Sequence, residues 1–297
     1  MKLVALIRLL RPKQWTKNLL VFAALIFAHQ FDDPAKVWTT VVAFVALCLV
    51  SSSVYALNDV LDQERDRAHP TKQKRPIASG ELGTAHGVVV MTVCLALGVA
   101  LGAWVGAPFL RGLAAYLALQ LLYNFLVKRE AVVDVMVIST GFVLRAVLGG
   151  LAISAEISGW LLFCTGALAL LLACAKRRHE FHLLGDGRGD SRAALLGYTG
   201  PALDAMVVFS ASVSAISYGI YAIESTTAEK YPNLVLTVPF VFFGILRYLF
   251  LTFAKDDGGE PESVLLKDWQ TLAAVILFLV AAFLALSDVN LRFFKYG

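Results

Sequence analysis

The chain has 297 residues, of which 58% are hydrophobic and only 16% are charged. In soluble globular domains about a quarter of the residues are charged. This composition therefore excludes a disordered chain, a fibrous repeat and an ordinary soluble enzyme. It indicates a protein embedded in a lipid bilayer. The net charge of +4 is modest, and we expect no nucleic-acid partner.

Nine apolar runs have the composition of membrane-spanning helices, for which about 20 residues are needed. The glycines at 98, 102 and 106 form a GxxxGxxxG ridge that favours close helix packing. We therefore predict an all-α integral membrane protein, a bundle of about nine transmembrane helices that forms one domain over residues 1–297. In chain order the runs lie near 18–33, 36–57, 87–108, 112–128, 131–153, 157–175, 201–223, 232–253 and 269–288.

The basic residues divide unevenly between the two sides of this bundle. Nineteen Lys and Arg residues fall on the N-terminus and the even-numbered loops, and five fall on the opposite side. Because cytoplasmic loops are enriched in Lys and Arg, we predict a multi-pass protein of the cell membrane (plasma or inner). Its N-terminus is cytoplasmic and its C-terminus is outside. The long second and sixth inner loops place the polar cavity on the cytoplasmic face.

An acidic cluster ends the second run. Asn58, Asp59, Asp62 and Asp66 have spacings that bring their side chains to one face of a helix. Carboxylates crowded at a membrane boundary are costly and are usually functional. Such oxygen ligands suit Mg²⁺, which commonly bridges to substrate phosphates. The alternative is a solvated helix end paired with nearby arginines.

A basic stretch follows the acidic cluster. It contains Lys72, Lys74 and Arg75 within a segment bracketed by prolines and a glycine. A metal-binding acidic cluster beside cations has the composition of a diphosphate site, in which Lys or Arg neutralises the remaining oxygens. The alternative for these cations is positive-inside topology alone.

Arg145 lies deep in an apolar run, where a charged side chain must face a partner or a polar cavity. Asp134 precedes it by three helical turns and so shares its face. The partner of Arg145 is Asp134, another carboxylate or a substrate phosphate.

The remaining inner boundaries carry further polar side chains that either line the cavity or act as interfacial anchors. The sixth inner loop opens with the cationic sequence KRRHE at 176–180, and Asp186 and Asp190 follow as a DxxxD pair. The other candidates are Lys17, Tyr123, Lys128, Lys176 and Glu180.

The segment 58–66, followed by Lys72 and the sequence RPIASG at 75–80, resembles the NDxxDxxxD signature of the UbiA superfamily of intramembrane prenyltransferases. The resemblance implies a nine-helix bundle with a cytoplasmic polar cavity, a bound prenyl diphosphate and Mg²⁺. Within the superfamily the likeness is closer to the phosphoribosyltransferase branch that acts on decaprenyl phosphate. The matching stretches are RPKQWTKN at 11–18, 58–80, 123–128, LRAVLGG at 144–150, KRRHE at 176–180, LRY at 246–248 and GGEPE at 258–262.

This likeness implies two substrates, 5-phosphoribosyl 1-diphosphate and a polyprenyl phosphate, with Mg²⁺ as the cofactor and the lipid bilayer as the environment. A homo-oligomer is compatible with such a chain. The resemblance places Asp59, Asp62 and Asp66 as catalytic residues, and these three together with Asn58 as metal ligands. The implied substrate-binding residues are Lys17, Lys72, Arg75, Tyr123, Lys128, Arg145, Lys176 and Glu180.

One departure separates this chain from the aromatic prenyltransferases, which carry a second Asp-rich motif at the sixth inner loop. Here KRRHE occupies that position, and Asp186 and Asp190 are either a displaced second motif or loop residues. A cationic patch suits a second phosphorylated substrate better than a neutral aromatic acceptor. The alternatives are a UbiA-type enzyme that transfers a prenyl group, and a lipid transporter without enzymatic activity.

Overall fold

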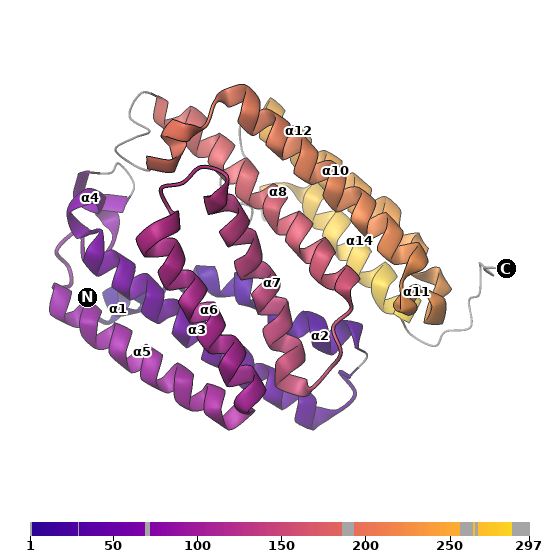
Figure 1. The fold of residues 1–297 in the computed structure, drawn as a ribbon, viewed down its shortest axis with the longest axis horizontal. Helices are drawn as coiled ribbons and strands as arrows, with labels where there is room; N and C mark the ends of the chain where they lie inside the picture. The colour runs from indigo at the N-terminus through magenta and orange to yellow at the C-terminus, as the bar shows by residue number, and fades with distance from the viewer. Residues whose placement is uncertain are drawn as a thin grey trace. The chain divides into compact units, whose positions relative to one another are not determined.

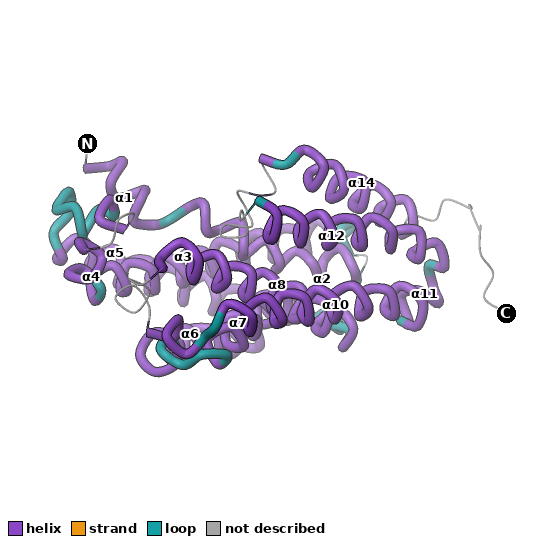
Figure 2. The backbone as a smooth tube through the Cα atoms, turned by 90° about the horizontal axis from the view of Figure 1, so that it is seen from above, coloured by secondary structure: helices purple, strands orange, loops and turns teal. Residues whose placement is uncertain are grey.

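The computed structural model describes residues 2–28, 30–68, 72–185, 193–255, 264 and 267–286. Within these ranges every regular element is a helix and no strand occurs (Figures 1 and 2). Eight of the described helices are long and apolar enough to cross a membrane. The predicted all-α integral membrane fold is therefore confirmed. The eight helices are Pro34–Leu61, Thr84–Val105, Ala107–Val127, Val133–Ile153, Gly159–Leu184, Gly200–Glu224, Pro232–Ala254 and Trp269–Leu286.

The chain forms two compact units. The first consists mainly of Met1–Arg129 and Thr140–Ile157, and the second mainly of Glu130–Ser139, Ser158–Gly189 and Ala193–Gly297. Helix α7 (Val133–Ile153) therefore contributes its first turns to one unit and the rest to the other. The prediction that all 297 residues make up one domain stays a prediction.

The first unit is organised around α3 (Pro34–Leu61), the longest of its helices. Asp33 caps the start of α3 by accepting a 2.9 Å hydrogen bond from the Ala35 amide, which satisfies one of the free N–H groups of the first turn. The other elements of this unit are α1 (Lys2–Leu10), η1 (Pro12–Leu20), α2 (Val21–Phe27), α4 (Gln63–Ala68), η2 (Lys72–Lys74), α5 (Thr84–Val105), α6 (Ala107–Leu122) and η3 (Tyr123–Val127).

Of the predicted glycine ridge, Gly98 lies in the packing of α3 against α5, which run side by side (Figure 1), whereas Gly102 faces α6. A Cβ atom built on Gly98 would lie 2.7 Å from Cγ2 of Val50 and 3.0 Å from the carbonyl oxygen of Ala46. The first distance is too short for a Cβ atom, and the second is tighter than most such contacts. Gly98 therefore allows the two backbones to approach closely, as small residues do between membrane helices.

The first predicted span, near 18–33, differs from the expected long helix. The α-helix α2 has seven residues, and the 3₁₀-helix η1 precedes it after a break at Arg11, whose φ is +53°. This broken segment nevertheless follows α3 in the opposite direction. Trp15 donates to Ser52, and further along the ring centroids of Phe22 and Phe44 are 5.6 Å apart. Two short helices thus replace the first predicted span, and they are not among the eight long apolar helices; nine spans stay a prediction.

The second unit packs α10 (Gly200–Glu224) against α8 (Gly159–Leu184), and α12 (Val238–Ala254) against α14 (Trp269–Leu286). Side-chain caps begin several of these helices: Ser158 precedes α8 and Thr199 precedes α10. The smaller elements are η5 (Ala193–Gly197), α11 (Thr226–Lys230) and η6 (Pro232–Thr237).

Candidate functional site

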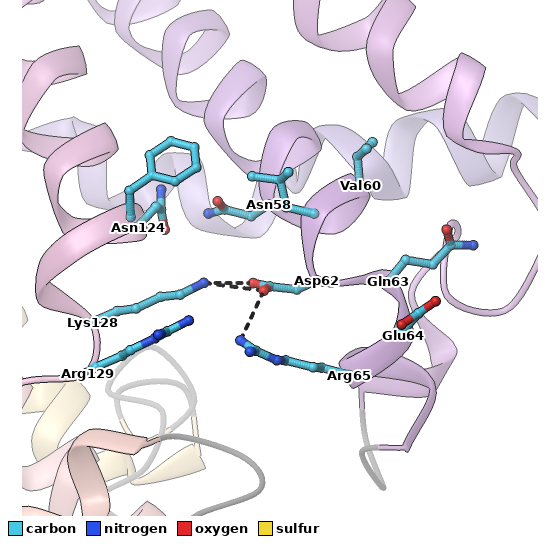
Figure 3. Close-up of a pocket in the computed structure, with 11 residues that line it drawn as sticks. Asn58, Val60, Asp62, Gln63, Glu64, Arg65, Asn124, Lys128 and Arg129 are labelled. Atoms are coloured by element: carbon cyan, nitrogen blue, oxygen red, sulfur yellow. Dashed lines mark hydrogen bonds and ion pairs between the residues drawn. The ribbon is translucent and has the colours of Figure 1, made fainter.

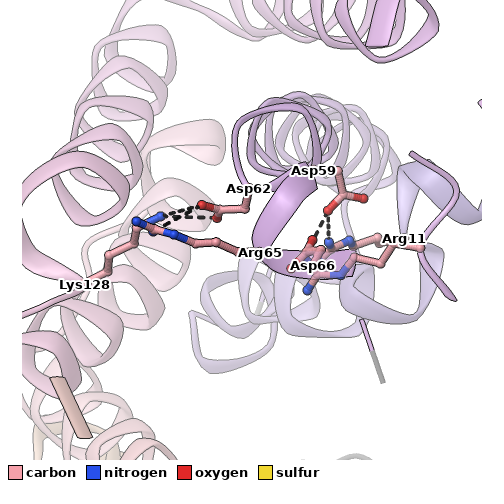
Figure 4. A network of polar contacts seen from close by, with 7 residues as sticks. Arg11, Asp59, Asp62, Arg65, Asp66 and Lys128 are labelled. Carbon is pink, nitrogen blue, oxygen red and sulfur yellow. Dashed lines mark hydrogen bonds and ion pairs between the residues drawn. The ribbon is translucent and has the colours of Figure 1, made fainter. Parts of the chain in front are cut away.

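The acidic cluster lies where α3 ends. Helix α3 stops at Leu61, Asp62 is a turn residue, and α4 begins at Gln63. The turn stays wound, because the Asp62 amide donates to the carbonyl of Asn58 and the Asp66 amide donates to the carbonyl of Asp62, both at 2.8 Å. The carboxylates nevertheless leave this turn in different directions and form two separate ion-pair groups (Figure 4).

The first group faces a pocket of about 540 Å³ in the first unit (Figure 3). Asp62 accepts hydrogen bonds from Nζ of Lys128 at 3.3 Å and 3.2 Å, one on each carboxylate oxygen. Nη1 of Arg65 lies 3.9 Å from the same carboxylate. The pocket therefore places side-chain oxygens that could bind a metal ion opposite cationic side chains. Its lining residues are Asn58, Val60, Leu61, Asp62, Gln63, Glu64, Arg65, Asn124, Phe125, Lys128 and Arg129.

A π-helical turn positions the opposite wall of this pocket. Helix α6 continues into η3 (Tyr123–Val127), and the Lys128 amide donates to the carbonyl of Tyr123 at 2.9 Å, an i to i+5 hydrogen bond. The extra residue in the turn rotates the following side chains relative to a regular α-helix. Such π-turns occur frequently at functional sites. Here the turn brings Asn124 and Lys128 to the pocket.

The second group contains Asp59 and Asp66, which do not line the pocket. Nη1 of Arg75 lies 3.2 Å from Asp59 and 2.6 Å from Asp66. Arg11 makes a second ion pair with Asp59 and stacks over the ring of Tyr55 at 5.1 Å. The two carboxylate side chains are only 1% and 4% exposed. They therefore tie the N-terminal segment and the loop after α4 to the end of α3.

This arrangement differs from the single helical face expected from the spacing. Asn58 and Asp62 lie on the pocket wall, whereas Asp59 and Asp66 are turned toward Arg11 and Arg75. No three acidic, His or Cys side chains among the described residues are close enough to hold a metal ion together. The physical reason is the end of α3 at Asp62, together with the guanidinium groups that occupy the other two carboxylates.

Arg145 is buried in the first unit, away from the pocket, and is 4% exposed. Its Nε donates to Asn18 at 2.9 Å, Nη1 to the Gly141 carbonyl at 2.7 Å and Nη2 to the Tyr116 hydroxyl at 2.9 Å. The rings of Tyr116 and Phe142 each lie 5.0 Å from its guanidinium carbon. These hydrogen bonds of Arg145 therefore go to neutral groups of the protein, and not to Asp134 or another carboxylate as the sequence suggested.

The other first-unit candidates do not line the pocket. Lys17 donates to Gln14 at 2.6 Å within η1. Lys72 starts η2, whose end leads directly to Arg75. Tyr123 begins the π-turn that positions Lys128. Their assignment as substrate-binding residues stays a prediction.

Lys176 and Glu180 lie near the end of α8 in the second unit, beside a buried ion cluster. Glu180 pairs with Arg177, and Nε of Arg177 lies 3.4 Å from Asp134. Tyr198 donates to Asp134 at 2.7 Å, and burial together with this hydrogen bond raises the pKa of the Tyr198 phenol far above its ordinary value. Tyr198 is therefore a neutral donor at physiological pH. Asp186, Asp190 and the 258–262 stretch lie outside the described residues.

Sequence reasoning missed five polar residues of the pocket: Gln63, Glu64, Arg65, Asn124 and Arg129. Asn124 lies within the π-turn and Arg129 follows it, and the apolar pattern of this segment does not distinguish a π-turn from a regular helical turn. Arg11 was also missed, since its contact with Asp59 joins segments 48 residues apart.

The chain matches the UbiA prenyltransferase family over residues 19–246. It is 36% identical to the decaprenyl-phosphate phosphoribosyltransferase of Mycolicibacterium smegmatis, over 89% of this chain and 86% of the relative. It is 37% identical to the enzyme of that name in Mycobacterium tuberculosis, over 88% of this chain and 87% of the relative. A UbiA homologue from Archaeoglobus fulgidus, solved with GPP and Mg²⁺, superposes with a TM-score of 0.74 at 17% identity, over 95% of this chain and 99% of that one. This protein is therefore a multi-pass membrane enzyme that belongs to the UbiA prenyltransferase family.

Proposed function

We propose that the protein transfers 5-phosphoribose from 5-phosphoribosyl 1-diphosphate to a polyprenyl phosphate and releases diphosphate. The observation that carries this proposal is the likeness at 36–37% identity to decaprenyl-phosphate phosphoribosyltransferases over nearly the whole chain. The pocket is compatible with such substrates, because oxygen donors and three cationic side chains line it together. Both substrates are polyanions, and cations are needed to bring them close to each other.

We propose Mg²⁺ as the cofactor, and the donor set of the pocket fits this ion. Asn58 and Asp62 offer amide and carboxylate oxygens on the pocket wall, and Mg²⁺ takes few protein oxygens and completes its shell with water and phosphate. Asp59 would also have a ligand to offer, because its Oδ2 is buried without a hydrogen-bond partner among the described residues. Asp59 and Asp66 would join the site only after release from Arg11 and Arg75.

The reaction is a substitution at the anomeric carbon of the ribose. Asn58 and Asp62 would hold Mg²⁺, which when bound would draw negative charge from the departing diphosphate. Lys128, Arg65 and Arg129 neutralise the remaining phosphate oxygens and orient them in the pocket. The attacking oxygen belongs to a phosphate that is already anionic at neutral pH, so no general base has to remove a proton. The polyprenyl chain lies along an apolar surface open to the bilayer.

We propose that the pocket faces the cytoplasm and that the protein sits in the cell membrane with its C-terminus outside. The uneven distribution of Lys and Arg supports this orientation. The composite first span supports it as well. Arg11 lies at the end of α3 that carries Asp59, and the chain then follows α3 to its other end at Asp33.

A donor panel tests the proposed reaction. Purified full-length protein with Mg²⁺ and decaprenyl phosphate is incubated with 5-phosphoribosyl 1-diphosphate, and the lipid product is identified by mass spectrometry. We expect a lipid heavier by one phosphoribosyl group, formed together with diphosphate. A parallel reaction contains a prenyl diphosphate and an aromatic acid. Prenyl transfer without pentosyl transfer would reject the proposal in favour of an aromatic prenyltransferase, and transfer in neither reaction would favour a transporter.

A further inference from the structure

The ion pair between Lys128 and Asp62 occupies the carboxylate that the pocket offers to a metal ion. Nζ lies 3.3 Å and 3.2 Å from the two oxygens of Asp62, so the ammonium group bridges both of them. The two residues are 66 positions apart, on the π-turn after α6 and on the turn after α3. The pair therefore spans the pocket from one wall to the other (Figure 3).

This pair is also the easiest of the cluster to open. The side chains of Lys128 and Asp62 are 25% and 27% exposed, whereas the carboxylates of Asp59 and Asp66 are almost fully buried. Exposed ion pairs are weak because water competes for both charges, and separating a buried pair leaves a charge without solvent. Lysine is moreover a flexible point charge rather than a fixed fork. Asp62 is thus the carboxylate that a metal ion reaches first.

A divalent cation and the Lys128 ammonium cannot share the Asp62 carboxylate without strong repulsion at this distance. When the metal binds Asp62, Lys128 must move. A phosphate group coordinated to that metal is the nearest strong acceptor for a free ammonium in the pocket, because charge-assisted hydrogen bonds to phosphate are short and strong.

We propose that Lys128 is a displaceable counter-ion: it neutralises Asp62 until a divalent cation takes that carboxylate, and it then binds the phosphate oxygens of the metal-bound diphosphate. This inference rests on the proposed metal and diphosphate site, and it does not depend on which group the enzyme transfers. Lys128 thereby couples the two binding events. Metal binding to Asp62 releases Lys128, and diphosphate binding holds Lys128 away from Asp62.

Binding of Mn²⁺ to the full-length protein in detergent tests the first half of the proposal. Mn²⁺ replaces Mg²⁺ at oxygen sites, and the free ion is quantified by electron paramagnetic resonance without any substrate. Lys128→Met removes the competitor, and we expect Mn²⁺ to bind about fivefold to tenfold more tightly than to the wild type, given the weakness of exposed ion pairs. Lys128→Arg should bind Mn²⁺ more weakly than the wild type, because a guanidinium can hold the carboxylate with two parallel hydrogen bonds.

Arg129→Gln is the matched control. It removes one positive charge from the same pocket wall, so it reports the general electrostatic effect without opening the Asp62 pair. Asp62→Asn should abolish the binding that Lys128→Met strengthens. Equal Mn²⁺ affinities for Lys128→Met and Arg129→Gln would overturn the proposal, as would tighter binding to Lys128→Arg than to the wild type. If Lys128→Met does not fold, the comparison of Lys128→Arg with the wild type decides.

Binding of inorganic diphosphate in saturating Mg²⁺ tests the second half. We expect Lys128→Met to lose about tenfold in diphosphate affinity, because a charge-assisted hydrogen bond is missing. Unchanged diphosphate affinity would show that Lys128 does not move to the phosphate. Neither assay contains a ribosyl or prenyl donor. If the donor panel shows no phosphoribosyl transfer, the binding results for Lys128 still hold. If the Mn²⁺ affinities do not follow the expected order, the role of Lys128 is rejected and the proposed reaction is not affected.

Discussion

At the scale of single residues, the four side chains of the acidic motif have different surroundings and should respond differently to the same substitution. Asp62 is a quarter exposed and pairs weakly with Lys128, whereas Asp66 is 4% exposed and holds Arg75 at 2.6 Å. A motif that looks uniform in the sequence thus combines one carboxylate that faces the pocket with another that holds a loop. The helix end at Asp62 causes this division.

Asparagine substitutions separate the two roles. Asp62→Asn should lower turnover by at least about 100-fold, as loss of an electrostatic group in an active site does, and should change the melting temperature less than Asp66→Asn, because the Asp62–Lys128 pair is a quarter exposed and water competes for its charges. Asp66→Asn should lower the free energy of unfolding by about 1–3 kcal/mol, because it weakens a buried charged contact of Arg75. Thermal melts in detergent beside turnover measurements check both. Equal melting temperatures for the two variants would contradict the division.

A second residue-scale prediction concerns Asp268, which precedes α14 outside the membrane-spanning segments. It accepts hydrogen bonds from Arg247 at 2.6 Å and 3.0 Å and from the Thr271 amide at 2.9 Å. The Arg247 contacts, followed by those of Thr271, hold the pKa of the Asp268 carboxyl well below its usual range. A carboxyl whose pKa is lower in the folded than in the unfolded state stabilises the fold at pH values above the unfolded pKa. This stabilisation is lost as the pH falls toward the folded pKa.

Asp268→Asn should therefore melt at a lower temperature than the wild type at neutral pH. The difference should shrink as the pH falls below about 4, where the unfolded carboxyl becomes protonated. Melting curves of both proteins between pH 7 and pH 3 measure this convergence. A constant difference over that range would mean that packing, and not the charge of Asp268, stabilises the start of α14.

At the scale of elements, the broken first span is held in place by polar contacts that the apolar pattern did not reveal. Its middle residue Asn18 is 1% exposed and lies against Cys48 and Ser51 of α3 and against Arg145 of α7. Apolar periodicity predicts where helices cross, but a 3₁₀ segment with a buried amide has no such period. Its geometry depends on partners 30 to 127 residues away.

A double-mutant cycle on Asn18 and Arg145 measures this attachment. Asn18→Ala and Arg145→Met should each destabilise the protein, and the double variant should lose less than the sum, with a coupling of about 0.5–3 kcal/mol for residues in one network. Chemical unfolding in mixed micelles gives the three free-energy differences. Strict additivity would show that Arg145 does not hold η1.

At the scale of the whole molecule, the fold class and the acidic motif could be predicted from the sequence because both rest on local patterns. Runs such as 87–108 need only composition, and Asn58 through Asp66 need only spacing. The pocket could not be predicted in the same way. Its second wall, with Asn124 and Lys128, depends on a π-turn, and the diversion of Asp59 depends on Arg11 in a distant segment. The spacing of residues within one segment does not reveal contacts with partners that are distant in the sequence.

Orientation in the membrane is a property of the whole chain, and the charge distribution predicts it. Gln73 lies in the basic loop on the proposed cytoplasmic side, and Glu229 lies in α11, which the charge distribution predicts to be outside; both residues are exposed. Single cysteines at these positions, in a background without Cys48, Cys94, Cys164 and Cys174, are treated in intact cells with a membrane-impermeant maleimide. We expect labelling at position 229 only, and labelling at both positions after the cells are permeabilised. Labelling at position 73 in intact cells would reverse the orientation. It would then place the Asp62 pocket on the outer face, where the proposed donor, a highly charged phosphate ester, could not arrive from the cytoplasm without crossing the membrane.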